Sequence, residues 1–126
     1  MMDQITDLLI RIKNAAAVRK NEVSMPYSKM KEAILLILKD NGFVANISIY
    51  EDKSRKLIKV TLPCTKYPSH IRQISKPGHR IYSKSKNIKI PLRGFGLLIV
   101  STPGGIITAQ EATKKGLGGE LICEIW

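Results

Sequence analysis

Apolar residues recur in the first third of the chain with the spacing of helices. One segment begins after Asp3, a potential N-cap, and has an apolar face formed by Ile5, Leu8, Leu9, Ile12 and Ala16. A second helix is expected from Lys29 to Lys39, after an N-cap at Ser28 and before a stop at residues 40–42. Because Leu35 and Leu36 make this helix apolar nearly all round, we expect it to be covered on more than one side.

Alternating apolar residues predict strands on both sides of the second helix. A short strand is expected from Glu22 to Pro26. Farther along, two alternating runs flank a charged turn at residues 51–56 and predict a hairpin; their apolar residues are Ala45, Ile47, Ile49, Ile58, Val60 and Leu62. The order is therefore helix, strand, helix, strand, strand, with two helices covering one face of a small sheet.

The second half predicts short strands and turns around one short helix. Lys76-Pro77-Gly78 is typical of a type II turn, and the apolar run at residues 97–100 predicts a central strand. Thr108 and Glu111 have the spacing of a capping box, and Gly116 ends the helix that they begin. Two glycines then turn the chain into a final strand at residues 121–125.

These elements predict an α+β protein with two small lobes. Residues 1–62 form an N-terminal lobe of two helices on three strands. Residues 63–68 are the candidate linker. Residues 69–126 form a mostly β lobe with the short helix.

Charge adds the strongest global signal. The chain has 21 Lys and Arg against 10 Asp and Glu, a net charge of +11, so an anionic partner is expected. From Lys66 to Arg93 the sequence holds basic residues and no acidic one. The cysteines, Cys64 and Cys123, show no metal-binding spacing and are interpreted as buried thiols in a reducing compartment. No apolar run approaches the roughly 20 residues that cross a bilayer, so a soluble intracellular protein is expected.

Catalytic and membrane-binding functions fit the sequence poorly. The phosphate-binding glycine motifs of nucleotide enzymes are missing, and His70 and His79 have no carboxylate nearby in the sequence. We therefore predict no enzyme, no cofactor and no metal site. A membrane-surface protein would carry its basic residues on an amphipathic helix, whereas here they lie in strands and turns.

Binding to RNA fits best. Lys84, Lys86 and Arg93 belong to a basic segment that can neutralise phosphates, and tyrosines at 67 and 82 can stack on bases or pack in the core. Ser101 and Thr102 offer short hydroxyls that can reach base edges or 2′-hydroxyl groups. No DNA-binding motif is present, which favours RNA over duplex DNA.

The two helices hold further candidates. Lys29 and Lys31 lie at the positive end of their helix dipole, which fits an external anion better than an internal salt bridge. Arg11 and Asn14 point away from the apolar face of the first helix, and a solvated helix surface is the alternative to RNA contact for both.

The residues quoted next resemble one known family. The run STPGGIITAQEATKKGLGGELICEIW at residues 101–126 is similar to the end of the S-eight family of small-subunit ribosomal proteins, in its bacterial and plastid branch. DQITDLLIRIKNA, VSMPYSKMKEAILLILKDNGFV and ISKPGHRIYSKS resemble its earlier segments, so the likeness covers the whole chain.

The resemblance implies a protein of the small ribosomal subunit that binds the central domain of the small-subunit ribosomal RNA early in assembly. It implies neighbouring ribosomal proteins as partners, no catalysis, and a location in the bacterial cytoplasm or the plastid stroma. The alternative is a translational repressor that binds a similar structure in its own operon mRNA. The positions matching the contact residues of the family are Ser101, Thr102, Gly104, Gly118, Gly119, Glu120, Arg80, Tyr82, Arg11, Asn14, Lys29 and Lys31.

Two positions leave the recognition of bases open. Pro103 stands where the family usually has a serine, so a hydroxyl and a backbone N–H are lost there. Glu120 can either cap N–H groups of its own turn or accept a hydrogen bond from RNA. The working hypothesis is that the bends at 101–104 and 118–120 meet at one exposed surface, beside a cationic flank.

Overall fold

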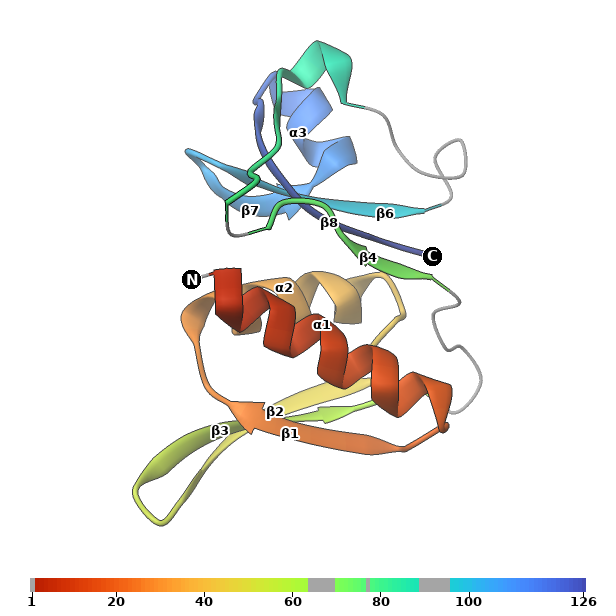
Figure 1. Ribbon diagram of the computed structural model, residues 1–126, viewed down its shortest axis with the longest axis vertical. Helices are drawn as coiled ribbons and strands as arrows, with labels where there is room; N and C mark the ends of the chain where they lie inside the picture. Colours follow the sequence, from red (N-terminus) through yellow and green to blue (C-terminus); the bar gives the residue numbers. More distant parts are fainter. Residues whose placement is uncertain (1, 64–69, 77, 89–95) are drawn as a thin grey trace. The chain divides into compact units, whose positions relative to one another are not determined.

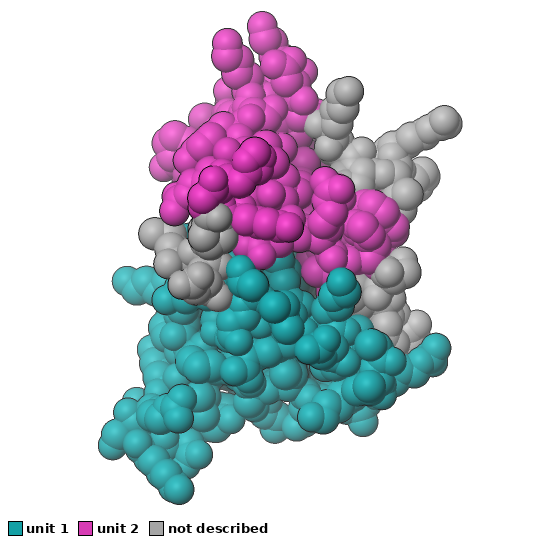
Figure 2. All heavy atoms as spheres, in the orientation of Figure 1, with its two compact units in different colours: residues 1, 3–68 teal, residues 2, 69–126 magenta. Residues whose placement is uncertain are grey.

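A computed structural model of the chain describes residues 2–63, 70–76, 78–88 and 96–126. Residues 3–68 form one compact unit and residues 69–126 form a second (Figure 2), and each unit is described by itself. Apart from Pro63, the predicted linker lies outside the described residues, so its role stays a prediction.

The first unit has the predicted order of elements, and the predicted α+β class is confirmed. The two helices lie on the same side of a three-stranded antiparallel sheet (Figure 1), in which β3 is central and β1 and β2 are the edges. The elements are α1 (Met2–Ala17), β1 (Glu22–Pro26), α2 (Lys29–Asp40), β2 (Asn46–Asp52) and β3 (Arg55–Thr61).

The core of this unit lies between the helices and the sheet. Ile58 and Val60 of β3 are fully buried, and apolar residues of β1 and β2 lie opposite them in the register. Directly opposed residues of neighbouring strands share one face, so the alternation seen in the sequence becomes an apolar layer under the helices. The helices contribute Ile5, Leu8, Leu9, Ile12, Ile34, Leu35 and Leu38.

One expectation about the helices was wrong. Helix α1 begins at Met2, so Asp3 lies inside the first turn and not at the N-cap position. In α2, Ile34, Leu35 and Leu38 are buried, whereas Leu36 is 46% exposed. The N-cap of α2 is confirmed, because the Ser28 hydroxyl accepts a hydrogen bond from the Lys31 backbone N–H at 3.1 Å.

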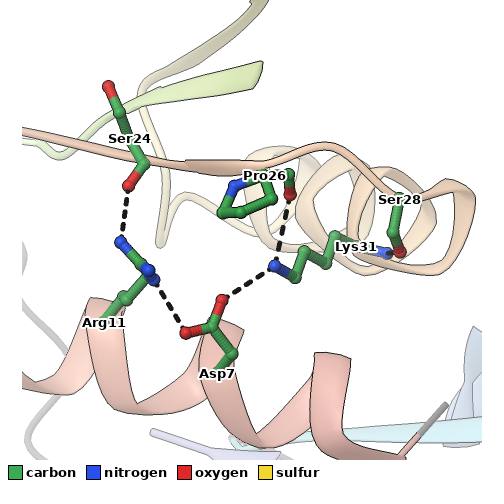
Figure 3. A network of polar contacts seen from close by, with 6 residues as sticks. All are labelled: Asp7, Arg11, Ser24, Pro26, Ser28 and Lys31. Carbon is green, nitrogen blue, oxygen red and sulfur yellow. Dashed lines mark hydrogen bonds and ion pairs between the residues drawn. The ribbon is translucent and has the colours of Figure 1, made fainter. Parts of the chain in front are cut away.

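A polar network joins α1 and α2 to β1 (Figure 3). The Asp7 carboxylate pairs with Arg11 through Oδ1 and with Lys31 through Oδ2, both at 2.8 Å. The Arg11 guanidinium also donates to the Ser24 carbonyl at 3.0 Å, and the Lys31 ammonium to the Pro26 carbonyl at 3.2 Å. Since the Lys31 side chain is only 4% exposed, the preference for an external anion over an internal salt bridge was wrong.

The Lys31 hydrogen bond holds the pKa of the Asp7 carboxyl below its ordinary value, and the Arg11 hydrogen bond acts in the same direction, against partial burial. A carboxyl whose pKa falls on folding stabilises the fold above its ordinary pKa. That contribution is lost as the pH falls through the lowered value.

The described residues of the second unit form a five-stranded antiparallel sheet and a short α-helix. The strand order is β4-β8-β6-β7, and β5 also pairs with β8. A small core forms around Leu98, Val100 and Ala109. The elements are β4 (Ile71–Gln73), β5 (Tyr82–Ser83), the 3-10 helix η1 (Ser85–Asn87), β6 (Leu97–Thr102), β7 (Gly105–Thr108), α3 (Ala109–Lys115) and β8 (Gly119–Ile125).

Local signals in this unit predicted its helix and one turn. The Thr108 hydroxyl accepts a hydrogen bond from the Glu111 N–H at 3.3 Å, and Gly116 ends α3 with a φ of 68°. At the predicted type II turn, Gly78 has a φ of 84°, the conformation that this turn requires at its third position. The backbones of Lys76 and His79 hydrogen-bond to each other across the turn at 2.9 and 3.0 Å.

We predict that Asp7→Asn lowers the free energy of unfolding by roughly 2–4 kcal/mol. The substitution leaves the buried Lys31 ammonium without its anion, which costs about 3–5 kcal/mol when the site is fully buried, and less here because Asp7 is 37% exposed. Urea denaturation at neutral pH measures the loss, which should shrink as the pH falls below about 4. Glu22→Gln, which breaks the exposed pair with Lys59, is the control and should cost less than about 0.5 kcal/mol. Equal losses for the two variants would contradict the importance of the network.

Candidate nucleic-acid interface

Three segments of the second unit meet around Glu120. This residue is the second of β8, and it lies opposite Ser101 of β6 and opposite Tyr82 of β5. Because directly opposed residues share one face of a sheet, the three side chains form a row across three strands. The prediction that the bends at 101–104 and 118–120 lie together is therefore confirmed for Ser101 and Glu120.

A β-bulge creates this alignment. The register of β6 with β8 shifts between Ile99 and Val100, so that Ile99 pairs with Cys123 but Val100 pairs with Leu121. Ile122 is the extra residue of the bulged strand. Without the bulge Ser101 would face Leu121, because a one-residue slip exchanges the two faces of a strand.

Two glycines allow the three segments to approach closely. A Cβ atom on Gly118 would lie 2.6 Å from the Ser83 carbonyl oxygen, and one on Gly119 would collide with the Ser101 carbonyl. Any side chain at either position would push the strands apart. Both glycines were predicted to contact RNA, and the structure shows a packing reason for each of them.

Thr102 and Pro103 shape the first bend. Thr102 is 9% exposed, and its hydroxyl donates to the Gly105 carbonyl at 2.8 Å while it accepts from the Gly104 N–H at 3.2 Å. The proton of this hydroxyl is thus used inside the bend, which differs from the expectation that it is available to a base edge. Pro103 is exposed at the tip, so the bend that Thr102 closes does not need a donor there.

One oxygen of the Glu120 carboxylate has no hydrogen-bond donor among the residues that the structure describes. This oxygen, Oε2, is buried. A buried carboxylate oxygen without a donor is costly, so native proteins rarely leave one in this state. Of the two roles left open by the sequence, capping of the turn is not seen, because no N–H group of a described residue donates to this oxygen.

An open concavity of about 600 Å³ lies beside this row. Tyr82, which is 66% exposed, forms part of its lining, together with Lys84. Ser83, Ser85 and Gly116 also line it and were not predicted, because small residues in a turn give no sequence signal. An exposed aromatic ring beside small polar groups and a lysine can stack on a base while the cation meets a phosphate.

The other predicted residues differ in their surroundings. Arg80, Lys84 and Lys86 are exposed, as a role with phosphates requires. In the first unit Asn14 and Lys29 are exposed, whereas Arg11 and Lys31 take part in the Asp7 network. Arg93, Lys89 and Tyr67 lie outside the described residues.

His70 does have a carboxylate nearby, which the sequence could not show. Its ring stacks on Trp126 at 3.8 Å between centroids, and its Nε2 lies 3.3 Å from Glu124 Oε1. Arg72 Nε lies 3.2 Å from the same oxygen. These residues join β4 to β8.

Cys123 is buried as predicted, and burial raises the pKa of its thiol to about 12, so it is protonated and inert at neutral pH. Cys64 lies outside the described residues. No three metal-ligating side chains gather within the part of the chain that the structure describes. None of the helices in that part is both long and apolar enough to cross a bilayer.

Comparison with known proteins agrees with the resemblance seen in the sequence. The family model described as Ribosomal protein S8, the S-eight family named above, matches residues 3–126. The protein named small ribosomal subunit protein uS8 from Bifidobacterium animalis is 40% identical, over 100% of this chain and 98% of the relative. The proteins of the same name from Caldanaerobacter subterraneus and Clostridium kluyveri are 43% and 41% identical over the same shares.

We predict that Gly119→Ala destabilises the second unit by roughly 1–3 kcal/mol, since the added methyl group forces β6 and β8 apart. Gly104→Ala is the matched control. A Cβ there would meet Leu117 Cδ1 at 3.5 Å and Thr102 Oγ1 at 3.7 Å, both ordinary contacts. Urea denaturation measures the free energy of unfolding of both variants. A Gly119→Ala chain as stable as the Gly104→Ala chain would contradict the close approach of β6 and β8 at Gly119.

Proposed function

Because the chain belongs to the ribosomal protein S8 family, a family of small-subunit ribosomal proteins and not of enzymes, we propose that it binds the small-subunit ribosomal RNA directly. The binding site is in the central domain of that RNA, and binding there helps the subunit to assemble. Neighbouring small-subunit proteins are its further partners, and a similarly folded segment of mRNA would fit the same surface.

One observation in the structure supports the proposal most, namely the row of Ser101, Glu120 and Tyr82. No described residue donates a hydrogen bond to Oε2 of Glu120 in this row. RNA supplies donors for a carboxylate, in the amino groups of bases and in 2′-hydroxyls, and the Glu120 residue is only partly buried. No described residue hydrogen-bonds to the Ser101 hydroxyl either, so it can also turn to a partner. A carboxylate in a strongly basic protein repels phosphates, and so this acceptor selects for the edge of a base or a sugar over the backbone.

Affinity and specificity then come from different groups. Arg80, Lys84, Lys86 and, by sequence, Arg93 neutralise phosphates, which gives strong binding that depends on salt but little on sequence. Glu120 and Ser101 form hydrogen bonds that depend on which groups RNA presents. Tyr82 offers a stacking surface for an unpaired base, which an irregular helix provides and a regular duplex does not.

We predict that Glu120→Gln weakens binding to a central-domain fragment of small-subunit ribosomal RNA by roughly tenfold to a hundredfold, the range for a lost hydrogen bond to a charged group. The unfolding temperature should be unchanged or slightly raised, because Oε2 has no donor among the described residues. Fluorescence anisotropy and thermal melts measure the two effects.

Glu111→Gln is the control for Glu120→Gln. It removes the same charge from an exposed position in the same unit, where only the Glu111 backbone N–H takes part in the cap. It should not weaken binding. Loss of stability with intact affinity in Glu120→Gln would show that the carboxylate is structural.

We predict that replacing Lys84 and Lys86 together by glutamine flattens the dependence of affinity on salt. For every phosphate that is no longer neutralised, the slope of log K against log salt should fall by about 0.7–0.9. Titrations between low and moderate salt measure the slope. Lys53→Gln, at the exposed tip of the β2–β3 hairpin, is the control, and an equal change there would show that the slope reports only net charge.

A further inference from the structure

The sheet of the first unit has two edges, β1 and β2. They differ in whether the outward-pointing N–H and C=O groups of the backbone have hydrogen-bond partners. An edge strand exposes every second N–H and C=O, which can pair with a strand from another chain. Proteins usually block such edges with charges, prolines or bulges.

The β1 edge is blocked. The Tyr27 N–H donates to the Lys56 carbonyl at 3.0 Å, so the backbone of Tyr27 points toward β3. Because backbone groups alternate along a strand, the carbonyls of Ser24 and Pro26 point outward. Arg11 and Lys31 donate to these two carbonyls (Figure 3), and Pro26 has no N–H to offer.

Between Asn46 and Tyr50 the β2 edge carries no such block. Since the Lys56 carbonyl points toward β1, the backbones of Leu57, Lys59 and Thr61 point toward β2. The Thr61 carbonyl accepts a hydrogen bond from the Ala45 N–H at 2.8 Å, which agrees with a Thr61 backbone that points toward β2. The register then directs the backbones of Asn46, Ser48 and Tyr50 toward β3, and those of Ile47, Ile49 and Glu51 outward. No described residue hydrogen-bonds to these three outward groups.

The side chains of β2 also suit a further strand. Six of its seven residues are exposed, including Ile49 at 41% and Tyr50 at 38%. Residues 46–50 contain neither a charge nor a proline, whereas Glu51 and Asp52 end the strand with two exposed carboxylates. The edge is therefore uncharged along most of its length and ends in two carboxylates, which lie opposite Lys56 and Arg55 of β3.

We propose that β2 accepts an extended segment of a neighbouring ribosomal protein as a fourth strand of this sheet. The segment has apolar side chains beside Ile47 and Ile49 and a basic residue beside Glu51 and Asp52. A second copy of this chain fits poorly, because two chains of net charge +11 repel each other. RNA fits poorly as well, because it has no extended peptide backbone whose alternating N–H and C=O groups could pair with the edge. The inference rests on the proposed place of the chain in the small subunit.

Site-specific cross-linking tests the proposal in assembled small subunits. A tagged chain carries a photoreactive amino acid in place of Ile49, and a matched chain carries it in place of Ser24, the exposed residue at the middle of the blocked edge. After purification of small subunits, the probe at position 49 should cross-link to one short segment of a ribosomal protein. The probe at position 24 should not cross-link to that segment.

Backbone hydrogen exchange, read residue by residue, provides a second readout. The amides of Ile47, Ile49 and Glu51 should exchange at least roughly tenfold more slowly in the subunit than in the free chain, because they become hydrogen-bonded. The amides of Ser48 and Tyr50 are already bonded to β3 and serve as internal controls.

The outcomes distinguish a failure of the proposed function from a failure of this inference. A tagged chain that never enters small subunits overturns the proposed function and this inference with it. A chain that enters them while position 49 cross-links to RNA, to a second copy or to nothing overturns this inference alone. Unchanged exchange at the three outward amides would also overturn it.

Discussion

The close approach of three backbone segments at Gly118 and Gly119 is the constraint on which the second unit depends. The Ser83 carbonyl and the Ser101 carbonyl occupy the space that a side chain at these positions would need. Only glycine permits β5 and β6 to flank the start of β8 at this distance. The bulge at Ile122 then turns Glu120 toward the same face as Ser101 and Tyr82. Packing and recognition are thus linked, because the residues that bring the strands together also set which side chains are presented.

The first unit shows a different use of polar residues. The resemblance predicted Arg11 and Lys31 to approach RNA, yet here they satisfy outward carbonyls of β1 and share one carboxylate, Asp7. A buried ammonium that is paired and hydrogen-bonded holds α2 against the strand edge at a tolerable desolvation cost. The same sheet leaves its other edge without comparable protection among the described residues. The contrast between the two edges, more than the exposure of either, motivates the search for a partner strand.

Much of the fold followed from short-range patterns in the sequence. The cap at Thr108 and the stop at Gly116 depend on residues a few positions apart, and periodicity fixed the two helices and the hairpin. The site was harder, because its geometry depends on pairings across the chain. The sequence placed Ser101 and Glu120 in two neighbouring bends, but no local signal marks the bulge that aligns them. Similarly, the partner of Lys31 lies 24 positions away and that of His70 lies 54 away, so neither contact could be read from the sequence.

The central claim is that Ser101, Glu120 and Tyr82 form one recognition surface for RNA. Cross-linking from its two flanks tests this most directly. Ser101→Cys and Tyr82→Cys chains, each with a photoreactive group on the new thiol, are bound to small-subunit ribosomal RNA in a Cys64→Ser background, where buried Cys123 does not react. The account predicts that both positions cross-link to nucleotides of the same short irregular helix in the central domain. Cross-links to separate regions of the RNA, or from only one of the two positions, would contradict it.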